Sequence, residues 1–193
     1  KDRILFEEIP EGTEYLQTVI DAMQRKKELK IDYKPFNGHQ SIFHLQPYAM
    51  KVYHQRWYVV GYLKEQEGIR NIALDRILEL TDDSFILPND FDAEEYYAHT
   101  VGIFVNDKLK PQKVVVRVFG VHVEYMRSLP LHFSQQEIKT EHKEYSDFEY
   151  QLCLTPELTS QLLAMGEKIE VMEPIGLREE IRKRLFAAIN RYK

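Results

Sequence analysis

The chain has 193 residues and a net charge of −5, and 44% of its residues are hydrophobic and 12% aromatic. This composition is that of a folded protein with a sizeable core, and it excludes a largely disordered chain. The negative net charge argues against a protein that binds nucleic acid through a generally basic surface.

The cysteine content and the start of the chain indicate the compartment. Cys153 is the single cysteine, which excludes an internal disulfide and a zinc site built from several cysteines. The sequence contains no apolar run of the roughly 18 residues that cross a bilayer, and its start has no signal-peptide pattern. These features favour a cytoplasmic protein. Because the first residue is lysine, we expect further sequence upstream and interpret residues 1–12 as the remnant of a linker.

The first half of the chain predicts one helix followed by short strands. Residues 13–27 predict the helix, because apolar residues recur at helical spacing and the segment ends in basic side chains. The dipeptide Asn37-Gly38 predicts a hairpin turn. Strand patterns cover residues 29–33, 41–46, 49–53, 56–62 and 69–80. A flat sheet this small would leave long edges exposed, so the prediction for residues 13–80 is closure into a small β-barrel.

An acidic connector follows this half. Residues 30–76 contain seven basic and four acidic residues, whereas residues 79–95 contain seven acidic residues and no basic one. We predict a connector over residues 81–106, with a short helix at 91–97 and the domain boundary near Asn106. Ordinary solvated surface charge is the alternative explanation of this contrast.

The second half, residues 107–193, predicts a ferredoxin-like βαββαβ order with a final helix. The strands are expected at residues 113–119, 134–142, 147–154 and 169–172. The helices are expected at residues 121–128, 158–165 and 175–192. Apolar residues share one face of the last helix: Leu177, Ile181, Leu185, Ala188 and Ile189. This face either covers its own sheet or pairs with a second copy, and we predict that the chain self-associates through this half.

Signatures of catalysis and of cofactor binding do not occur in the sequence. No glycine-rich phosphate loop is present, and no two of the seven histidines have the i, i+4 spacing of a helical zinc site. The adjacent acids Glu94-Glu95 and Glu179-Glu180 point to different sides of a helix and do not make a carboxylate pair. We therefore predict no catalytic residue, no metal ligand and no cofactor, and we expect that the chain is not an enzyme.

One stretch of the sequence carries a family resemblance. The segment Arg56-Trp57-Tyr58-Val59-Val60-Gly61-Tyr62, followed by Arg70 and by Ala73-Leu74-Asp75-Arg76-Ile77, resembles the signature of the WYL domain family. Upstream, Ile31-Asp32-Tyr33 and Pro47 fall where that family has its first strand and a proline. Residues 166–178 resemble the end of the extension that often follows a WYL domain.

The sequence departs from the family pattern at two places. Val59 replaces the leucine of the signature. Ile72 and Ala73 stand where many members carry an aromatic residue followed by an arginine, so one cation of the family's presumed pocket is missing.

The resemblance implies an α+β chain from a bacterial transcriptional regulator: a Sm-like, SH3-type small β-barrel with an N-terminal helix, followed by a ferredoxin-like extension. It implies that the barrel binds a nucleotide or single-stranded nucleic acid as effector. It also implies a homodimer that holds duplex DNA only through an N-terminal helix-turn-helix, which is absent from this sequence.

The expected ligand-binding residues combine the signature with strand geometry. Arg56 and Tyr58 share one face of a strand, where they can present a cation and a stacking ring. We predict a concave site formed by Tyr33, Arg56, Tyr58, Arg70 and Arg76, with His44 and Lys51 at its edge. Alternatively, Asp75 and Arg76 form an ion pair that only fixes the barrel.

Two further functions remain open at this stage. The first is a constitutive nucleic-acid-binding module, because small Sm-like barrels can bind RNA or single-stranded DNA. The second is a purely structural dimerisation piece. A helix-turn-helix upstream would favour the regulator over both.

Overall fold

The computed structural model describes residues 12–85, 90–138, 142 and 144–192. The chain divides into two compact units, residues 1–95 and 96–193. This division falls inside the connector predicted for residues 81–106. None of the described helices is long and apolar enough to cross a membrane.

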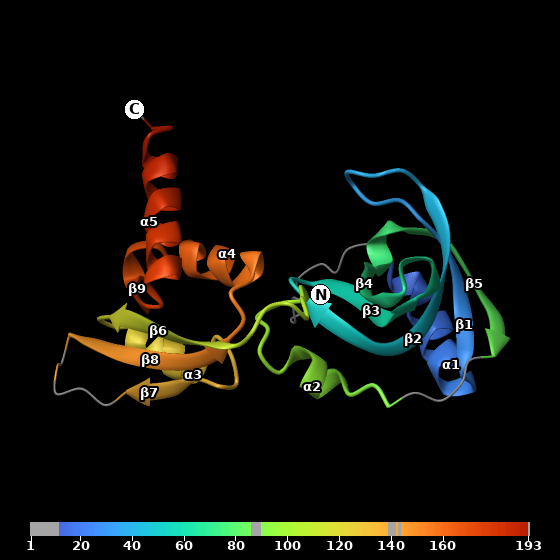
Figure 1. Cartoon of the computed structure of the whole chain (residues 1–193), viewed down its shortest axis with the longest axis horizontal. Helices are drawn as coiled ribbons and strands as arrows, with labels where there is room; N and C mark the ends of the chain where they lie inside the picture. Colours follow the sequence, from blue (N-terminus) through green and yellow to red (C-terminus); the bar gives the residue numbers. More distant parts are fainter. Residues whose placement is uncertain (1–11, 86–89, 139–141, 143, 193) are drawn as a thin grey trace, which may run out of the picture. The chain divides into compact units, whose positions relative to one another are not determined.

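The first unit contains one helix and a five-stranded antiparallel sheet. A 3₁₀ turn, η1 (Thr13–Tyr15), leads into the helix α1 (Leu16–Arg25). The strands are β1 (Lys27–Tyr33), β2 (Ser41–Tyr53), β3 (Arg56–Leu63), β4 (Gly68–Ala73) and β5 (Ile77–Phe85). The 3₁₀ turns η2 (Lys64–Gln66) and η3 (Leu74–Arg76) join β3 to β4 and β4 to β5. The strand order is β4-β3-β2-β1-β5 (Figure 1).

The predicted closed barrel is wrong. The strands β4 and β5 are the two edges of the sheet, and among the described residues no ladder joins them. The turn η3 redirects the chain after β4, so that β5 pairs with β1 instead. The helix α1 packs against β1, β2 and β5, and its Val19 and Ala22 are buried in the same core as Leu29 and Ile31. The helix thus covers one face of the sheet, while β4 and β5 remain its two edges.

The strand β2 is continuous where two strands were predicted. Pro47, which was expected to end the first of them, lies inside β2, and the pairing with β3 shifts register between Pro47 and Ala49. A bulge of this kind accommodates a residue that cannot donate to the ladder. Gly61 lies opposite Pro47, and a Cβ added to it would sit 2.1 Å from the Gln46 carbonyl oxygen. Close backbone approach therefore requires glycine at this position.

The core of the first unit follows the alternation of its strands. Leu29, Leu45 and Val59 are fully buried, and Trp57 packs against this cluster. The shared strand face of Trp57 and Val59 had predicted that placement. The predicted strand over residues 69–80 is interrupted by η3, which bends the chain between β4 and β5.

The second unit has the predicted βαββαβ order with a final helix. Its strands are β6 (Gln112–Phe119), β7 (Gln136–Ile138), β8 (Tyr145–Leu152) and β9 (Ile169–Glu173). Its helices are α3 (His122–Ser128), α4 (Pro156–Ala164) and α5 (Ile175–Ile189), with the 3₁₀ turn η4 (Gly166–Lys168) before β9. The short helix α2 (Ala93–Tyr97) spans the boundary between the two units. The sheet order is β7-β8-β6-β9, antiparallel throughout. The prediction for β7 was residues 134–142, of which 139–141 lie outside the described residues.

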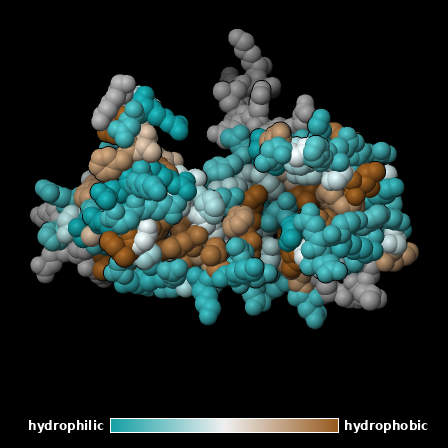
Figure 2. All heavy atoms as spheres, turned by 45° about the horizontal axis from the view of Figure 1, so that its top comes forward, coloured by the Kyte–Doolittle hydropathy of each residue, from teal (hydrophilic) through white to brown (hydrophobic). Residues whose placement is uncertain are grey.

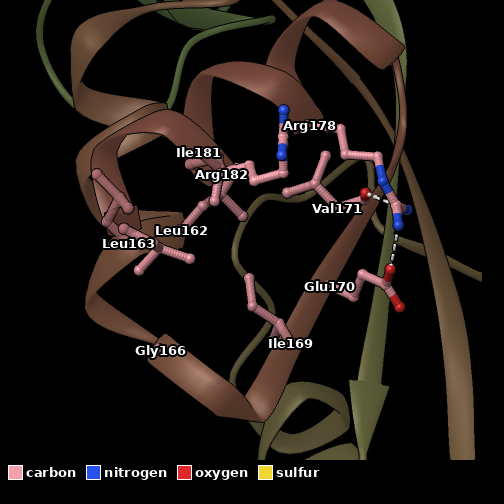
Figure 3. A pocket seen from close by; sticks show the side chains of 10 residues that line it. Leu162, Leu163, Gly166, Ile169, Glu170, Val171, Arg178, Ile181 and Arg182 are labelled. Carbon is pink, nitrogen blue, oxygen red and sulfur yellow. Dashed lines mark hydrogen bonds and ion pairs between the residues drawn. The ribbon is translucent and has the colours of Figure 1, made fainter. Parts of the chain in front are cut away.

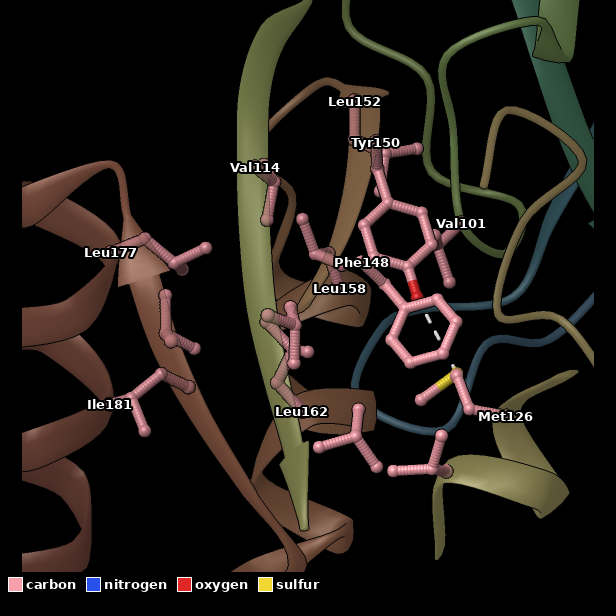
Figure 4. Packing of buried hydrophobic residues seen from close by; sticks show 14 residues of the cluster. Val101, Val114, Met126, Phe148, Tyr150, Leu152, Leu158, Leu162, Leu177 and Ile181 are labelled. Atoms are coloured by element: carbon pink, nitrogen blue, oxygen red, sulfur yellow. Dashed lines mark hydrogen bonds between the residues drawn. The ribbon is translucent and has the colours of Figure 1, made fainter. Parts of the chain in front are cut away.

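Every other residue of β6 and β8 enters the core of the second unit. Val114 and Val116 of β6 lie opposite Tyr150 and Phe148 of β8. Figure 4 shows the two rings side by side, with Met126 of α3 beside the Tyr150 hydroxyl. Further apolar side chains reach the same cluster from α4 and α5: Leu158, Leu162, Leu177 and Ile181.

The apolar face predicted for α5 is only half used by its own unit. Leu177 and Ile181 are buried, whereas Leu185 is 45% and Ile189 is 59% exposed. In Figure 1 the C-terminal end of α5, in red, projects away from the sheet of its unit. The face of the molecule in Figure 2 is largely hydrophilic, with hydrophobic residues gathered in separate patches.

Candidate anion-binding site on the first unit

Two guanidinium groups lie against one exposed aromatic ring in the first unit. The ring belongs to Phe36, which lies in the loop between β1 and β2 and is 74% exposed. Its centroid is 4.2 Å from Cζ of Arg76 and 5.6 Å from Cζ of Arg56. Cations at these distances are attracted by the face of the ring, so the loop presents an aromatic surface flanked by positive charge.

The local fold explains how these three residues meet. Arg56 is the first residue of β3, and Arg76 is the last residue of η3. The Lys34 backbone N–H donates to the Arg76 carbonyl oxygen at 3.1 Å, which ties the loop of Phe36 to η3. Gly12 packs closely on the other side: its φ is +104°, and an added Cβ would lie 2.5 Å from the Asp75 backbone nitrogen.

A carboxylate accompanies the two cations. Nε of Arg56 is 3.2 Å from Oδ2 of Asp75, whose side chain is 9% exposed. An ion pair between Asp75 and Arg76 was the alternative left open by the sequence, but the carboxylate contacts Arg56. With one carboxylate and two guanidinium groups, the site has a net positive charge.

Arg76 is the member of the site with unused donor capacity. Its Nε is buried and has no hydrogen-bond partner among the residues that the structure describes. Burial raises the pKa of the neighbouring Tyr33, while the charge of Arg76 and its hydrogen bond to the phenol act in the opposite direction. Tyr33 therefore stays neutral near neutral pH and places a hydroxyl beside the guanidinium.

The structure brings together three of the seven predicted ligand residues, Tyr33, Arg56 and Arg76. Tyr58 is only 7% exposed, so its ring presents little surface, and Lys51 lies opposite it on β2.

The remaining two predicted ligand residues, Arg70 and His44, have other partners. Arg70 donates to Oε1 of Gln66 at 2.8 Å and to the carbonyl oxygen of Ile69 at 2.9 Å. Nδ1 of His44 is 2.8 Å from a carboxylate oxygen of Glu65.

Phe36 was missed by the sequence analysis. The signal was a large aromatic residue directly before the turn dipeptide Asn37-Gly38. Hairpin loops face the solvent and often carry binding residues, so an aromatic ring at such a place is a candidate for ligand contact.

A pocket of about 250 Å³ in the second unit was also considered. It lies between α4, β9 and α5 and has Leu162, Ile169 and Ile181 in its apolar wall. Figure 3 shows that Arg178, at its edge, is paired with Glu170, and Arg178 also donates to the Val171 carbonyl oxygen. Arg182 contacts Glu179 at 2.8 Å. Because both cations are paired, this pocket offers less to an anion than the site around Phe36.

The fold and the site define a protein of two units: a small antiparallel sheet with a cationic aromatic site, followed by a βαββαβ unit. Residues 14–82 match the WYL domain and residues 110–189 match the WCX domain. The chain therefore carries a WYL domain followed by a WCX domain.

Two solved structures resemble this chain. The first is proteasome accessory factor B/C (PafBC) of Arthrobacter aurescens, with 18% identity and a TM-score of 0.41 over 97% of this chain and 30% of that chain. The second is a CRISPR Cas-related protein, with 13% identity and a TM-score of 0.51 over 94% of this chain and 52% of that chain. This chain therefore spans less than two thirds of either protein. The likeness to the CRISPR Cas-related protein concerns the fold alone. No curated protein sequence matches the chain.

Proposed function

We propose that this chain is the effector-sensing region of a DNA-binding transcriptional regulator and has no catalytic role. The pairing of a WYL with a WCX domain supports the regulator class. The effector is a phosphate-bearing ligand, either a nucleotide or a single-stranded nucleic acid, bound by the first unit.

The observation that carries this proposal is the Phe36 ring between the guanidinium groups of Arg56 and Arg76. Guanidinium groups bind phosphate oxygens through paired hydrogen bonds, and an exposed ring stacks on a base without selecting its identity. A ligand that carries both a phosphate and a base would contact the two guanidinium groups and the ring.

The unsatisfied donor of Arg76 supports the same ligand class. A buried donor without an acceptor costs about 1–3 kcal/mol, and a rotation of the Arg76 side chain that brings Nε to a phosphate oxygen would remove that cost. Tyr33 adds a hydroxyl donor, and we place Lys51 and Tyr58 at the border of the site. We do not include Arg70 and His44, because both are held by other side chains.

The net charge of −5 supports a division of labour within the regulator. Affinity for duplex DNA comes mainly from neutralised phosphates, so an acidic chain is poorly suited to hold a promoter. We propose that a helix-turn-helix elsewhere in the regulator binds DNA. Binding of the effector by this chain then changes how the homodimeric regulator holds the DNA.

Dimerisation is proposed to involve the second unit. The exposed apolar residues Leu185, Phe186 and Ile189 lie on the projecting half of α5, where they contribute nothing to the core of their own unit. Burial against a second copy would remove this apolar surface from water.

Calorimetric titration of the purified chain tests the ligand class. Short single-stranded DNA, its 5′-phosphorylated form and cyclic nucleotides are titrated into the wild type and into Arg56→Ala, Arg76→Ala and Phe36→Ala. Loss of a guanidinium that meets a phosphate should weaken binding by about 1–3 kcal/mol. Arg25→Ala, at the exposed end of α1, is the matched control for charge and should bind like the wild type.

Two further variants separate the proposed roles. Arg56→Lys and Arg76→Lys keep the charge but lose paired hydrogen bonding, so they should bind more weakly than the wild type. Ligands that bind all of these variants equally well would show that the site is structural. Tight, salt-sensitive binding of duplex DNA by the chain alone would support a constitutive nucleic-acid-binding module instead.

A further inference from the structure

A second group of polar side chains lies on the first unit, on three neighbouring strands. Glu28 comes from β1, His44 from β2 and Asp83 from β5. One candidate ligand atom of each lies within 4.8 Å of those of the other two. Because β1 lies between β2 and β5 in the sheet, the group bridges three adjacent strands.

The imidazole of His44 is held in a defined orientation by Glu65. Nδ1 is 2.8 Å from Oε1 of Glu65, and the His44 backbone N–H donates to both oxygens of the same carboxylate at 3.0 and 3.1 Å. In a neutral imidazole, a hydrogen bond from Nδ1–H to this carboxylate would leave the lone pair of Nε2 for a metal ion. This carboxylate–histidine arrangement is the usual support of a metal-bound imidazole.

The other nitrogen of His44 points to a second carboxylate at a distance that fits two ligands of one ion. Nε2 is 3.7 Å from Oδ2 of Asp83, which is too long for a hydrogen bond. Two ligands of a tetrahedral zinc ion, each bound at about 2.0–2.1 Å, lie roughly 3.3 Å apart. A small rotation of the Asp83 side chain closes the difference.

Glu28 supplies a buried carboxylate. The residue is 2% exposed, and its charged partner is Lys64, with Nζ 2.7 and 3.0 Å from the two oxygens. The Lys64 side chain is 48% exposed, so its ammonium can move into solvent when another cation neutralises Glu28 in its place. Glu28, Glu65 and Asp83 bring three carboxylates to the group and Lys64 one ammonium, so negative charge is in excess.

We propose that Glu28, His44 and Asp83 bind a divalent transition-metal ion, with zinc as the ion best matched, in place of the Lys64 ammonium. One imidazole nitrogen and two carboxylate oxygens are a ligand set that zinc accepts, with water in the fourth position. Glu65 is a positioning residue that orients His44. The ion would link β1, β2 and β5, and the proposal is independent of the effector site.

Zinc titration of the metal-free chain, prepared with a chelator and dialysed, tests the site. We expect one zinc ion per chain by calorimetry and a zinc-dependent rise in melting temperature, because an ion that binds only the folded state stabilises it. Cobalt(II) should give a visible absorption spectrum at the same stoichiometry. If the wild type shows no saturable binding of zinc, the proposal is overturned.

Substitutions identify the ligands. His44→Gln and Asp83→Asn should weaken zinc binding by more than Glu65→Gln does, for which about 10- to 100-fold is expected from the loss of an outer carboxylate. His39→Gln, on an exposed loop residue, is the matched control and should bind like the wild type. Equal binding by His44→Gln and His39→Gln overturns the assignment.

Lys64→Met separates a metal site from a plain ion-pair network. Removal of the competing ammonium should strengthen zinc binding if the site is real, because zinc then no longer has to displace it. If Lys64 only neutralises Glu28, the variant should lose stability and gain no affinity for zinc. That result, in a variant that stays folded by circular dichroism, contradicts the site.

Discussion

Arg56 and Asp75 form an ion pair in which Nε of the arginine lies 3.2 Å from Oδ2 of the aspartate. The pair joins the start of β3 to η3, the turn that directs β5 towards β1. Oδ1 of the same carboxylate is buried without a hydrogen-bond partner among the described residues. Asp75 therefore neutralises part of the charge that we propose for phosphate binding.

We expect Asp75→Asn to increase the affinity of the first unit for a phosphate-bearing ligand. The amide keeps the shape of the side chain but carries no negative charge, so it attracts the Arg56 guanidinium less strongly. An ion pair of this exposure contributes up to about 1 kcal/mol, so the gain should be no more than about fivefold. Calorimetry with the oligonucleotide that binds the wild type measures it.

Asp107→Asn is the control for the change in net charge, since Asp107 is exposed and lies in the second unit. It should leave the affinity unchanged. A Asp75→Asn variant that stays folded and binds more weakly than the wild type would show that the carboxylate itself contacts the ligand or orders the site.

The sequence predicted the elements of both units better than their pairing. The aromatic strand Arg56–Leu63 and the βαββαβ order of the second unit follow from local periodicity and were predicted. Barrel closure depends on whether two distant edges meet, which no local pattern encodes. Pro47 illustrates a local rule that tertiary structure overrode, because a bulge opposite Gly61 keeps β2 continuous.

In the candidate site too, the residues of the local signature were predicted and the long-range contacts were not. Arg56 and Arg76 lie in the family signature, and the structure places both beside one ring. That ring, Phe36, belongs to a loop whose course depends on its backbone contact with η3. His44 was predicted at the edge of the pocket, but its contacts with Glu65 and Asp83 join residues far apart in the chain. Such long-range contacts cannot be read from spacing.

Gly61→Ala should destabilise the first unit. The added Cβ would lie 2.1 Å from the Gln46 carbonyl oxygen, and neither backbone can move without disturbing the β2–β3 ladder. Overpacking of this kind costs about 1–3 kcal/mol, to be measured by urea unfolding. Gly176→Ala, in α5 with no atom near the new Cβ, is the control and should be neutral or stabilising by up to about 1 kcal/mol. Equal stabilities of the two variants would contradict the close approach.

Tyr150→Phe should weaken the second unit at neutral pH. The fully buried Tyr150 donates to Oε1 of Gln135 at 2.9 Å, and Gln135 in turn accepts from the Leu131 N–H and donates to the Met126 carbonyl oxygen. Because Gln135 keeps those other bonds, the loss should be about 1 kcal/mol. Urea unfolding at pH 7 measures it, and an unchanged free energy of unfolding would show that the hydroxyl contributes nothing.

The same substitution should have a smaller effect in alkali. Burial raises the pKa of Tyr150 above that of an unfolded tyrosine, which is about 10. The stability linked to the neutral phenol is therefore complete below about pH 10 and is lost as the pH rises towards the folded-state pKa. Phenylalanine does not titrate, so the stability difference between the wild type and Tyr150→Phe should shrink above that pH. A difference that stays constant would indicate a phenol that ionises as easily in the folded protein as in the unfolded one.

Leu185→Asp combined with Ile189→Asp should dissociate the proposed dimer. The two residues lie four apart on α5, so they share one helix face, and both are exposed in the single chain. Burying one such side chain contributes about 1.5–3 kcal/mol, and a carboxylate in its place adds a desolvation cost. We therefore expect the wild type to sediment as a dimer at micromolar concentration and the double variant as a monomer with unchanged circular dichroism. Val121→Asp, at an apolar residue exposed next to α3, should leave the dimer intact. If the wild type is a monomer, or if Val121→Asp dissociates the dimer and the α5 variant does not, the projecting half of α5 is not the interface.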